Sequence, residues 1–278
     1  MQNENRLIGM IVPTVDNSFF AGLSCEADRY LNERQYELVL CVSANDAERE
    51  KVCFRRLISS GVAGILCVSG LSALPEDLLP ESCPLVWLDR RPQAKRPVPW
   101  VANDDAAATE EATAFLLEKG CKNILLLPGF LAEHQESPRV AGYRRALEKK
   151  GVAFREEYIL RRSGKKSSEA ETEELLLALL KNGDAIDGVI ASSDRSAFGA
   201  MTALRKVGRY TPEDVKLICF DNSPYSAMAS PAITALDRNP KLLAEKACET
   251  LLQILSGAAK IEEEMLVPVS LVQRDSTR

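Results

Sequence analysis

Short apolar runs alternate with longer stretches of helical periodicity along almost the whole chain. Nine runs of strand length are expected, at 7–12, 37–42, 64–69, 85–88, 123–127, 157–160, 188–192, 216–220 and 266–272. Most of these runs are apolar throughout, which is typical of strands that are covered on both faces. The alternation therefore predicts βα units around parallel sheets.

Two of the stretches between the strands show helical spacing most clearly. Apolar residues three and four positions apart predict a helix over 240–257, at Leu243, Ala247, Leu251, Ile254 and Leu255, and another before Gly120, at Ala108, Ala112, Phe115 and Leu116. Pro240 suits the first turn of one helix, and Gly120 suits the end of the other. Helices are therefore expected between the predicted strands.

A proline-rich stretch at 91–99 separates two halves of this pattern. The stretch is expected to be extended, and it closes a first run of four βα units before a second run begins. Each half has the size of one doubly wound sheet, so two lobes with a cleft between them are the simplest architecture. Ligands of such folds bind beyond the carboxyl ends of the strands.

Polar and aromatic residues follow the predicted strands of the first half. Asn17 and Ser18 can cap a helix, while Phe19 and Phe20 can belong to the core or stack on an apolar ring face. Asp89 and Arg90, after the fourth strand, can form a local ion pair or offer acceptors and donors to a polyol. Both interpretations stay open for both loops.

The second half repeats this arrangement after three of its strands. The polar residues there are His134, Ser137, Arg139, Ser192, Ser193, Asp194, Asp221 and Asn222. Capping is the structural alternative for Ser193, Asp194 and Asn222, and surface solvation is the alternative for Arg139. Their shared position at strand ends favours a ligand site facing the first half.

Composition narrows the function classes. The 278 residues are 46% hydrophobic and 27% charged, as in packed globular proteins, and 35 basic against 40 acidic residues give 35 − 40 = −5. This balance disfavours binding of bare DNA or an anionic membrane. The eight cysteines form no Cys-x-x-Cys pair and are expected to be reduced, and the single histidine weakens zinc and hydrolase interpretations.

The sequence lacks three motifs that are typical of cofactor binding and catalysis. No G-x-G-x-x-G follows the first strand, residues 164–167 lack the pattern of a P-loop, and no G-x-S-x-G occurs. The basic run at 161–166 lies among glutamates and is expected to be a solvated loop. The first apolar run is too short for a signal peptide or a membrane span. We therefore expect a cytoplasmic protein that is not an enzyme and has no cofactor, metal or membrane association.

The loops together resemble a known family. The segments that carry the resemblance are 8–13 (IGMIVP), 17–20 (NSFF), 61–65 (GVAGI), 89–90 (DR), 103–104 (ND), 139–143 (RVAGY), 193–194 (SD), 212–215 (PEDV) and 220–221 (FD). In this order and spacing they resemble the effector-binding region of the LacI/GalR family of bacterial transcription regulators. The resemblance covers essentially the whole chain and extends to periplasmic sugar-binding proteins of the same fold.

The resemblance implies an architecture and a binding site. The fold would be α/β, with two doubly wound parallel-sheet lobes joined by three crossovers, as in type I periplasmic binding proteins. The lobes would be 6–103 with 238–265, and 104–237 with 266–278. The ligand-facing positions would be Asn17, Phe19, Phe20, Ser69, Asp89, Arg90, Arg139, Ser193, Asp221 and Arg238.

Three positions depart from the sugar-binding pattern of the family. Ser193 and Ser69 stand where relatives often have amides, and Arg238 stands where an amide is common. Two fewer amides and one more guanidinium suit an acidic or phosphorylated sugar better than a neutral one.

The resemblance also implies a function. We expect the effector-binding domain of a LacI-type repressor that acts as a homodimer, in which a sugar-like ligand closes the lobes and alters DNA affinity. The family's helix-turn-helix does not precede the first strand here, so operator DNA would be bound only through an N-terminal domain outside this sequence. A solute-binding protein of a sugar transporter is the alternative, and a small-molecule enzyme is the less favoured one.

Overall fold

The chain folds into two compact units, each built around its own sheet. A computed structural model describes residues 6–75, 78, 83–95, 97–129, 137–163, 166–183 and 185–278. Among these, unit 1 contains residues up to 103 together with 239–267, and unit 2 contains 104–129, 137–238 and 268–278. The chain therefore passes from one unit to the other after 103, after 238 and after 267.

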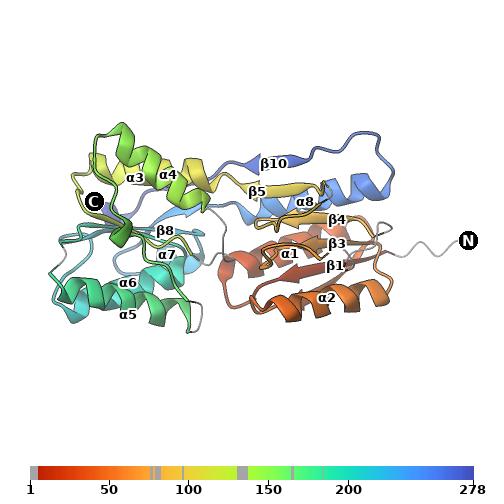
Figure 1. Ribbon diagram of the computed structural model, residues 1–278, viewed down its shortest axis with the longest axis horizontal. Helices are drawn as coiled ribbons and strands as arrows, with labels where there is room; N and C mark the ends of the chain where they lie inside the picture. The colour runs from red at the N-terminus through yellow and green to blue at the C-terminus, as the bar shows by residue number, and fades with distance from the viewer. Residues whose placement is uncertain are drawn as a thin grey trace, which may run out of the picture. The chain divides into compact units, whose positions relative to one another are not determined.

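Unit 1 is a parallel sheet covered by helices on both faces (Figure 1). The strand order is β10-β5-β4-β3-β1-β2, with β1 Leu7–Val12, β2 Glu37–Val42, β3 Gly64–Cys67, β4 Leu85–Leu88, β5 Trp100–Asn103 and β10 Glu264–Val267. Its helices are α1 Ser18–Asn32, α2 Ala47–Ser59 and α8 Pro240–Leu255. All its strand pairs are parallel.

The alternation of side chains along β1 divides the core of unit 1 into two layers. Ile8, Met10 and Val12 pack with α1 and α8, whereas Ile11 packs with α2. Gly9 faces α2 as well, because a Cβ there would lie 2.7 Å from a Leu57 methyl carbon. The sheet is therefore buried on both faces, as its apolar runs predict.

Unit 2 has five strands in the order β11-β9-β8-β7-β6. They are β6 Ile124–Leu126, β7 Gly188–Ala191, β8 Lys216–Phe220, β9 Thr234–Asp237 and β11 Ser270–Val272, and only β11 runs antiparallel to its neighbour. The helices α3 Asp105–Glu118 and α4 Pro138–Lys149 cover one face, and α5 Ser168–Lys181 and α6 Asp194–Lys206 cover the other. Short helical segments are α7 Pro224–Met228, η1 Glu156–Tyr158 and η2 Asp275–Thr277.

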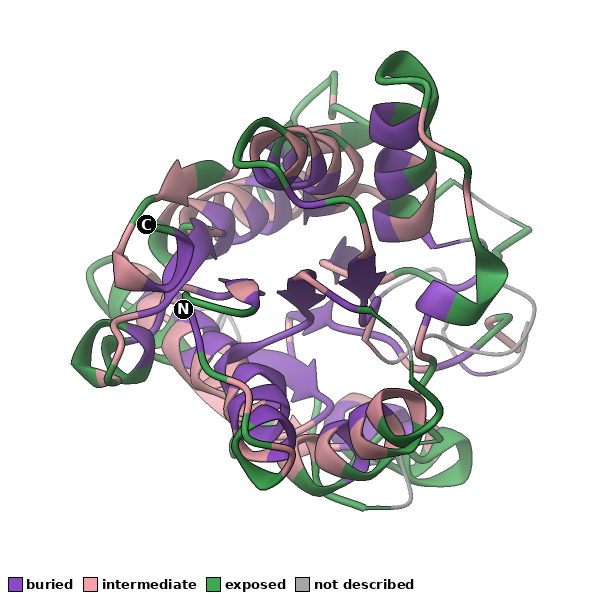
Figure 2. Ribbon diagram, turned by 90° about the vertical axis from the view of Figure 1, so that its left-hand side faces the viewer, coloured by how far each residue is buried: buried purple, intermediate pink, exposed green. Residues whose placement is uncertain are grey.

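Close approach of the paired helices of unit 2 requires two glycines. A Cβ at Gly142 of α4 would lie 2.0 Å from the carbonyl oxygen of Ala106 in α3. A Cβ at Gly199 of α6 would lie 2.3 Å from the carbonyl oxygen of Glu169 in α5. Figure 2 shows buried residues along the strands and exposed residues on the outer sides of the helices.

The α/β fold and its sheets agree with the expectation, but two predicted strands are wrong. The segment 157–160 is not a strand: residues Glu156–Tyr158 form a 3-10 helix, because successive amides bond carbonyls three residues back, and only Ile159 bridges to Leu126. The segment 266–272 is two strands, β10 and β11, in different sheets. Pro268, which lacks an amide hydrogen, lies between them.

Sequence analysis also missed β5 and β9. Both have four residues and end in a polar residue, Asn103 and Asp237. Pro240 begins α8, and Gly120, at φ +90°, follows α3, as expected. No helix among the described residues is long and apolar enough to span a membrane.

Candidate functional site

In unit 1, the predicted ligand residues lie after the carboxyl ends of β1, β3 and β4. Asn17 caps α1, because its Oδ1 accepts from the amides of Phe19 at 2.9 Å and Phe20 at 3.2 Å. Phe19 is 2% exposed and belongs to the core, while Phe20 is half-buried and meets it edge-on at 5.3 Å between ring centroids. Of the two rings, Phe20 is therefore the more accessible.

Asp89 and Arg90 form the polar end of β4. Asp89 has a left-handed φ of +61°, and its amide still bonds the carbonyl of Val101. The Nε of Arg90 lies 3.9 Å from Oδ2 of Asp89, which is an ion pair without a close hydrogen bond. The guanidinium of Arg90 lies 5.5 Å from the ring centroid of Phe20, and its Nη1 donates to Oδ1 of Asn45 at 3.3 Å. The ends of β2 and β4 and the start of α1 therefore meet around one guanidinium.

Ser69, after β3, is bonded to a residue that sequence analysis missed. Its Oγ donates to Oε1 of Glu50 at 2.5 Å, and the amide of Gly70 donates to Oε2 at 2.7 Å. Glu50 lies on α2 and is fully buried. Burial raises the pKa of Glu50, and the hydrogen bonds from Ser69 and Gly70 and the charge of Arg90 offset this only in part.

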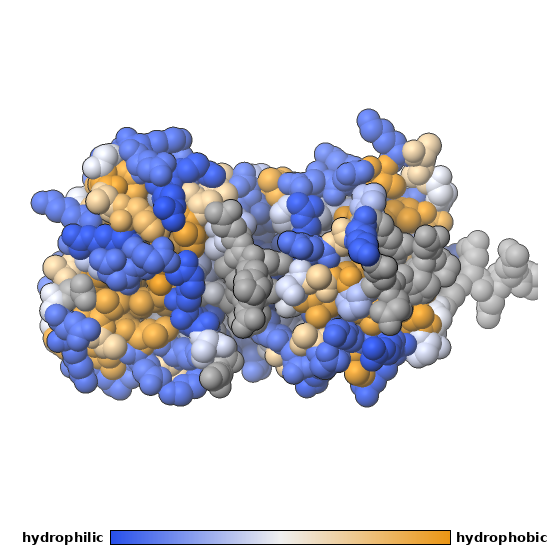
Figure 3. Space-filling model, viewed as in Figure 1, coloured by the Kyte–Doolittle hydropathy of each residue, from blue (hydrophilic) through white to orange (hydrophobic). Residues whose placement is uncertain are grey.

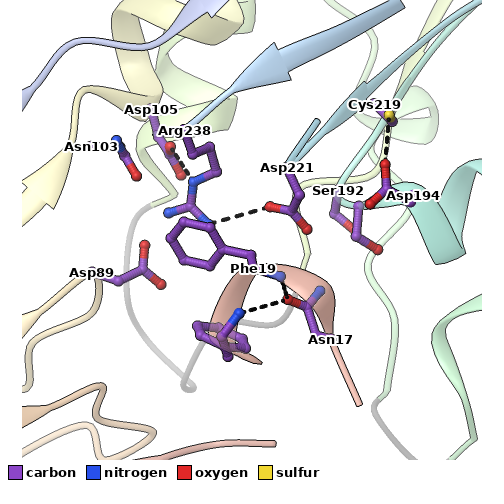
Figure 4. Close-up of polar contacts among 12 residues, drawn as sticks. Asn17, Phe19, Asp89, Asn103, Asp105, Ser192, Asp194, Cys219, Asp221 and Arg238 are labelled. Carbon is purple, nitrogen blue, oxygen red and sulfur yellow. Dashed lines mark hydrogen bonds and ion pairs between the residues drawn. The ribbon is translucent and has the colours of Figure 1, made fainter. Parts of the chain in front are cut away.

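A charged network occupies the carboxyl edge of unit 2 (Figure 4). The Nε of Arg139 donates to Oδ2 of Asp105 at 2.8 Å. Arg238, which follows β9, lies with its Nε 3.6 Å from Oδ1 of Asp105 and with its Nη1 3.6 Å from Oδ1 of Asp221. Two carboxylates thus face two guanidinium groups, and the predicted residues Arg139, Asp221 and Arg238 are brought together in this unit.

Arg139 is packed as well as paired. Its guanidinium lies 3.6 Å from the ring centroid of Phe220, and its Nη1 donates to the carbonyls of Pro128 at 3.4 Å and Ser192 at 3.3 Å. The residue is 9% exposed, so surface solvation is wrong as its alternative role. Its planar, multiply bonded geometry is one that lysine could not supply.

Asp105 has a lowered pKa. Its side chain is 17% exposed, and this burial opposes ionisation, but the positive charges of Arg139 and Arg238 outweigh the effect. Asp221 has a left-handed φ of +92°, which brings its carboxylate beside Arg238 directly after β8. The network is therefore charged on both sides.

The remaining polar residues of unit 2 act mainly as structural caps. Ser137 caps α4 and Ser193 caps α6, where its Oγ accepts from the amide of Ser196 at 3.3 Å. Asn222 joins Asp237 and Arg274 through its amide group. These contacts agree with the capping alternative for Ser193.

Asp194, at the start of α6, is buried and bonded to uncharged groups. Cys219 donates its thiol at 3.4 Å, and hydroxyls of Ser223 and Ser226 also contact the carboxylate. Burial raises the pKa of Asp194 despite these hydrogen bonds.

Glu50 and Asp105 were the functional candidates that sequence analysis overlooked. Glu50 precedes Cys53, Phe54 and Leu57 by three, four and seven residues, so it lies on the apolar stripe of α2. Asp105 directly follows the crossover at 103 and 104. His134, expected in the loop before α4, and residues 164 and 165 of the basic run lie outside the described residues. Within the described residues, no group of three or more His, Cys, Asp and Glu side chains is arranged to hold a metal ion.

Comparison with known proteins decides the family. The pattern of the periplasmic binding protein-like domain matches residues 113–277, which is more than half of the chain. The chain belongs to this family. Among curated proteins, this periplasmic binding protein-like chain is similar to a ribose operon repressor of Halalkalibacterium halodurans. The two are 28% identical over 273 residues, covering 98% of this chain and 80% of the relative.

Solved structures extend the likeness. A putative LacI-family transcriptional regulator from Sanguibacter keddieii is 28% identical, with a TM-score of 0.86 and 99% of each chain covered. A periplasmic binding protein/LacI transcriptional regulator from Alkaliphilus metalliredigens, solved in complex with D-xylulofuranose, is 25% identical, with a TM-score of 0.83 and coverage of 98% and 99%. The type I periplasmic-binding-protein-like fold of the chain is thus established.

Proposed function

We propose that this chain is the effector-binding part of a LacI-type transcription repressor and that its effector is a neutral, hydroxyl-rich small molecule. Binding of the ligand at the carboxyl edge of a sheet would change the operator affinity of a homodimeric, cytoplasmic regulator. The chain itself would carry out no catalysis. The similarity to the repressors along almost the full chain supports the regulatory role.

The charge balance of the site supports a neutral ligand. In unit 2, Arg139 and Arg238 face Asp105 and Asp221, and in unit 1 Arg90 faces Asp89. Every predicted guanidinium therefore has a carboxylate beside it. An anionic ligand would have to displace these carboxylates, whereas sugar hydroxyls can donate to carboxylates and accept from guanidinium groups at once.

This proposal replaces the acidic or phosphorylated sugar that residue types alone suggest. Arg238, the extra guanidinium, is 3% exposed and lies between Asp105 and Asp221. Its charge is therefore matched within unit 2. The matched charges of this buried network are the single observation that carries the choice of ligand class.

A thermal-shift screen tests the proposal. The panel contains D-ribose, D-xylulose and cellobiose together with D-ribose 5-phosphate and D-gluconate, because the neutral and anionic forms differ in charge. A ligand at about a hundredfold excess over its dissociation constant adds about 2.7 kcal/mol of stability. We expect the midpoint temperature of thermal unfolding to rise with a neutral sugar. Stabilisation by the anions alone would contradict the proposal of a neutral ligand.

A matched pair of variants links the response to the site. Asp221→Asn removes the carboxylate beside Arg238, and we expect it to abolish the thermal shift. Glu213→Gln changes an exposed acid of the same unit and should leave the shift unchanged. Equal shifts in both variants would place the ligand elsewhere.

Hydrophilic side chains predominate on the face shown in Figure 3, with apolar ones interspersed on both units. The net charge of −5 adds no general attraction to DNA. In the proposed mechanism, DNA affinity therefore belongs to another part of the full-length regulator. A mobility-shift assay of the full-length gene product with its own promoter fragment should show binding that the neutral sugar changes.

A further inference from the structure

A buried glutamate lies near the carboxyl ends of the strands of unit 1, where the predicted ligand residues lie. Glu50 is in the first turn of α2 and is 0% exposed, and the other buried residues on the same helix face are apolar. A carboxylate in this position costs stability unless it is hydrogen-bonded. Its neighbours therefore show what it is bonded to.

Both carboxylate oxygens are occupied by the segment that follows β3. Ser69 Oγ donates to Oε1 at 2.5 Å, and the amide of Gly70 donates to Oε2 at 2.7 Å. The Sγ of Cys67 lies 3.9 Å from Oε1. Glu50 therefore contacts three residues at the end of β3 and directly after it, Cys67, Ser69 and Gly70.

Two other ionisable side chains, Arg90 and Cys67, act on this carboxylate. Arg90, after β4, is the cation that favours its ionised form, and Arg90 is itself close to Asp89. Cys67 of β3 is the other titratable group that faces it, and burial raises the pKa of that thiol well above its usual value. Glu50 is therefore the side chain at the end of β3 whose protonation can change.

We infer that Glu50 is a positioning residue that fixes the Ser69–Gly70–Leu71 turn and determines that Ser69 meets the ligand as a hydrogen-bond acceptor. The hydroxyl of Ser69 has one hydrogen, which it donates to Glu50 in a hydrogen bond. The amide of Leu71 donates to Ser69 Oγ at 3.1 Å and uses one lone pair. No other hydrogen bond involves Ser69 Oγ among the described residues, so one lone pair remains for a ligand donor.

Protonation would reverse this polarity. The amide of Gly70 still needs an acceptor at Oε2, so the added proton belongs on Oε1, from which it is donated to Ser69 Oγ. The hydroxyl of Ser69 then releases its own hydrogen toward the ligand edge. Glu50→Gln places an amide nitrogen at the position of Oε1 and reproduces the protonated arrangement at every pH.

The test begins without ligand. In ¹⁵N-labelled protein, the Gly70 and Leu71 amide signals are followed over about pH 4–8, a range that spans titration of a carboxyl with a raised pKa. We expect both signals to shift in one transition in the wild type and to stay constant in Glu50→Gln. Glu48→Gln, an exposed acid of the same turn, is the matched control and should titrate like the wild type.

Either of two results would overturn the positioning role: signals that do not move in the wild type, or signals that move equally in Glu50→Gln. If Glu50→Gln does not fold, Ser69→Ala provides the second measurement. The Gly70 amide should still titrate in that variant, since it bonds Glu50 directly, whereas the transition at Leu71 should disappear. Titration of Leu71 in Ser69→Ala would contradict the polarity assigned to Ser69.

The ligand half of the inference rests on the proposed function, and D-ribose is its probe. We expect D-ribose affinity to fall about tenfold in Glu50→Gln, and to fall in the wild type on acidification through the Glu50 transition, because a lost hydrogen bond has about this effect. Equal affinity in both proteins at neutral pH would overturn the specificity claim. The affinity is measured by calorimetric titration. Absence of binding heat with either protein would count against the proposed function for this sugar, while the amide titration alone would decide the role of Glu50.

Discussion

Glu50 in unit 1 is buried and Asp105 in unit 2 is largely buried, and both lie near the carboxyl ends of strands, but their pKa values move in opposite directions. Burial raises the pKa of Glu50, whose direct partners are a hydroxyl, an amide and a thiol. The pKa of Asp105 is lowered because Arg139 and Arg238 face it. Partner charge therefore decides the direction where burial is common to both.

Asp194 sharpens this comparison, since it lies in unit 2 but behaves like Glu50. Its partners include the Cys219 thiol and serine hydroxyls, and its pKa is raised. The difference therefore follows the chemistry of the partners rather than the unit. Charged partners therefore favour the ionised form of Asp105, whereas the uncharged partners of Glu50 and Asp194 leave the pKa of each carboxyl raised.

Removing Arg139, one of the two cations beside Asp105, is expected to have the largest effect. Arg139→Ala leaves Asp105 with only the more distant Arg238, and we expect a loss of about 3 kcal/mol of unfolding free energy. Urea denaturation measures this loss. Arg145→Ala on the same helix breaks only the exposed pair with Glu110 and should cost less than about 1 kcal/mol. Similar small losses in both variants would mean that Asp105 does not depend on its cations.

Neutralising Asp105 should change stability in acid. Its folded-state pKa lies below the unfolded value, so the folded state binds fewer protons, and its contribution is present above the unfolded pKa and is lost as pH falls through the folded one. Asp105→Asn should cost about 2 kcal/mol at neutral pH and flatten this acid loss. Urea midpoints across the acid range test the slope, and an unchanged slope would refute the lowered pKa.

Glu50→Gln should have a smaller effect of opposite sign. The folded-state pKa of Glu50 lies above the unfolded value, so the folded state binds more protons in that interval and stability decreases as pH rises through it. The variant should gain about 1 kcal/mol or less at neutral pH and lose this slope. Denaturation at matched pH values measures it. A slope like that of Asp105 would break the comparison.

Asp89→Asn should have the smallest effect on stability. Its carboxylate lies 3.9 Å from the Arg90 Nε, and asparagine tolerates the left-handed backbone found there. We expect a change within about 0.5 kcal/mol, measured by urea denaturation. The thermal shift caused by a neutral sugar should nevertheless disappear, and a retained shift would remove Asp89 from the site.

Sequence periodicity predicted most of the sheet, because strands buried on both faces are continuous apolar runs. The exceptions have physical reasons. Trp100–Asn103 follows a proline-rich stretch and is short, and the run at 157–160 buries Tyr158 and Ile159 without joining a ladder beyond one bridge. The local sequence pattern alone does not distinguish apolar residues that are only buried in the core from apolar residues that also pair with a neighbouring strand.

The site was harder to predict than the fold. Asp221 and Arg238 follow the adjacent strands β8 and β9, whereas Arg139 lies on α4 after β6, and the resemblance to a family indicated all three residues. Nothing local shows that Asp105 joins them, since this contact spans 34 residues from Arg139. Glu50 had a visible signal, an acid on an apolar helix stripe, but its partner Ser69 is 19 residues away.

The central claim is that a neutral, hydroxyl-rich ligand binds at the carboxyl edge of unit 2, where the charged network lies. A crystal structure with the panel sugar that raises the midpoint most tests this claim directly. The account predicts sugar hydroxyls within about 2.5–3.0 Å of carboxylate oxygens of Asp221. A sugar that makes no hydrogen bond to this network, or that is bound away from this edge, would contradict it.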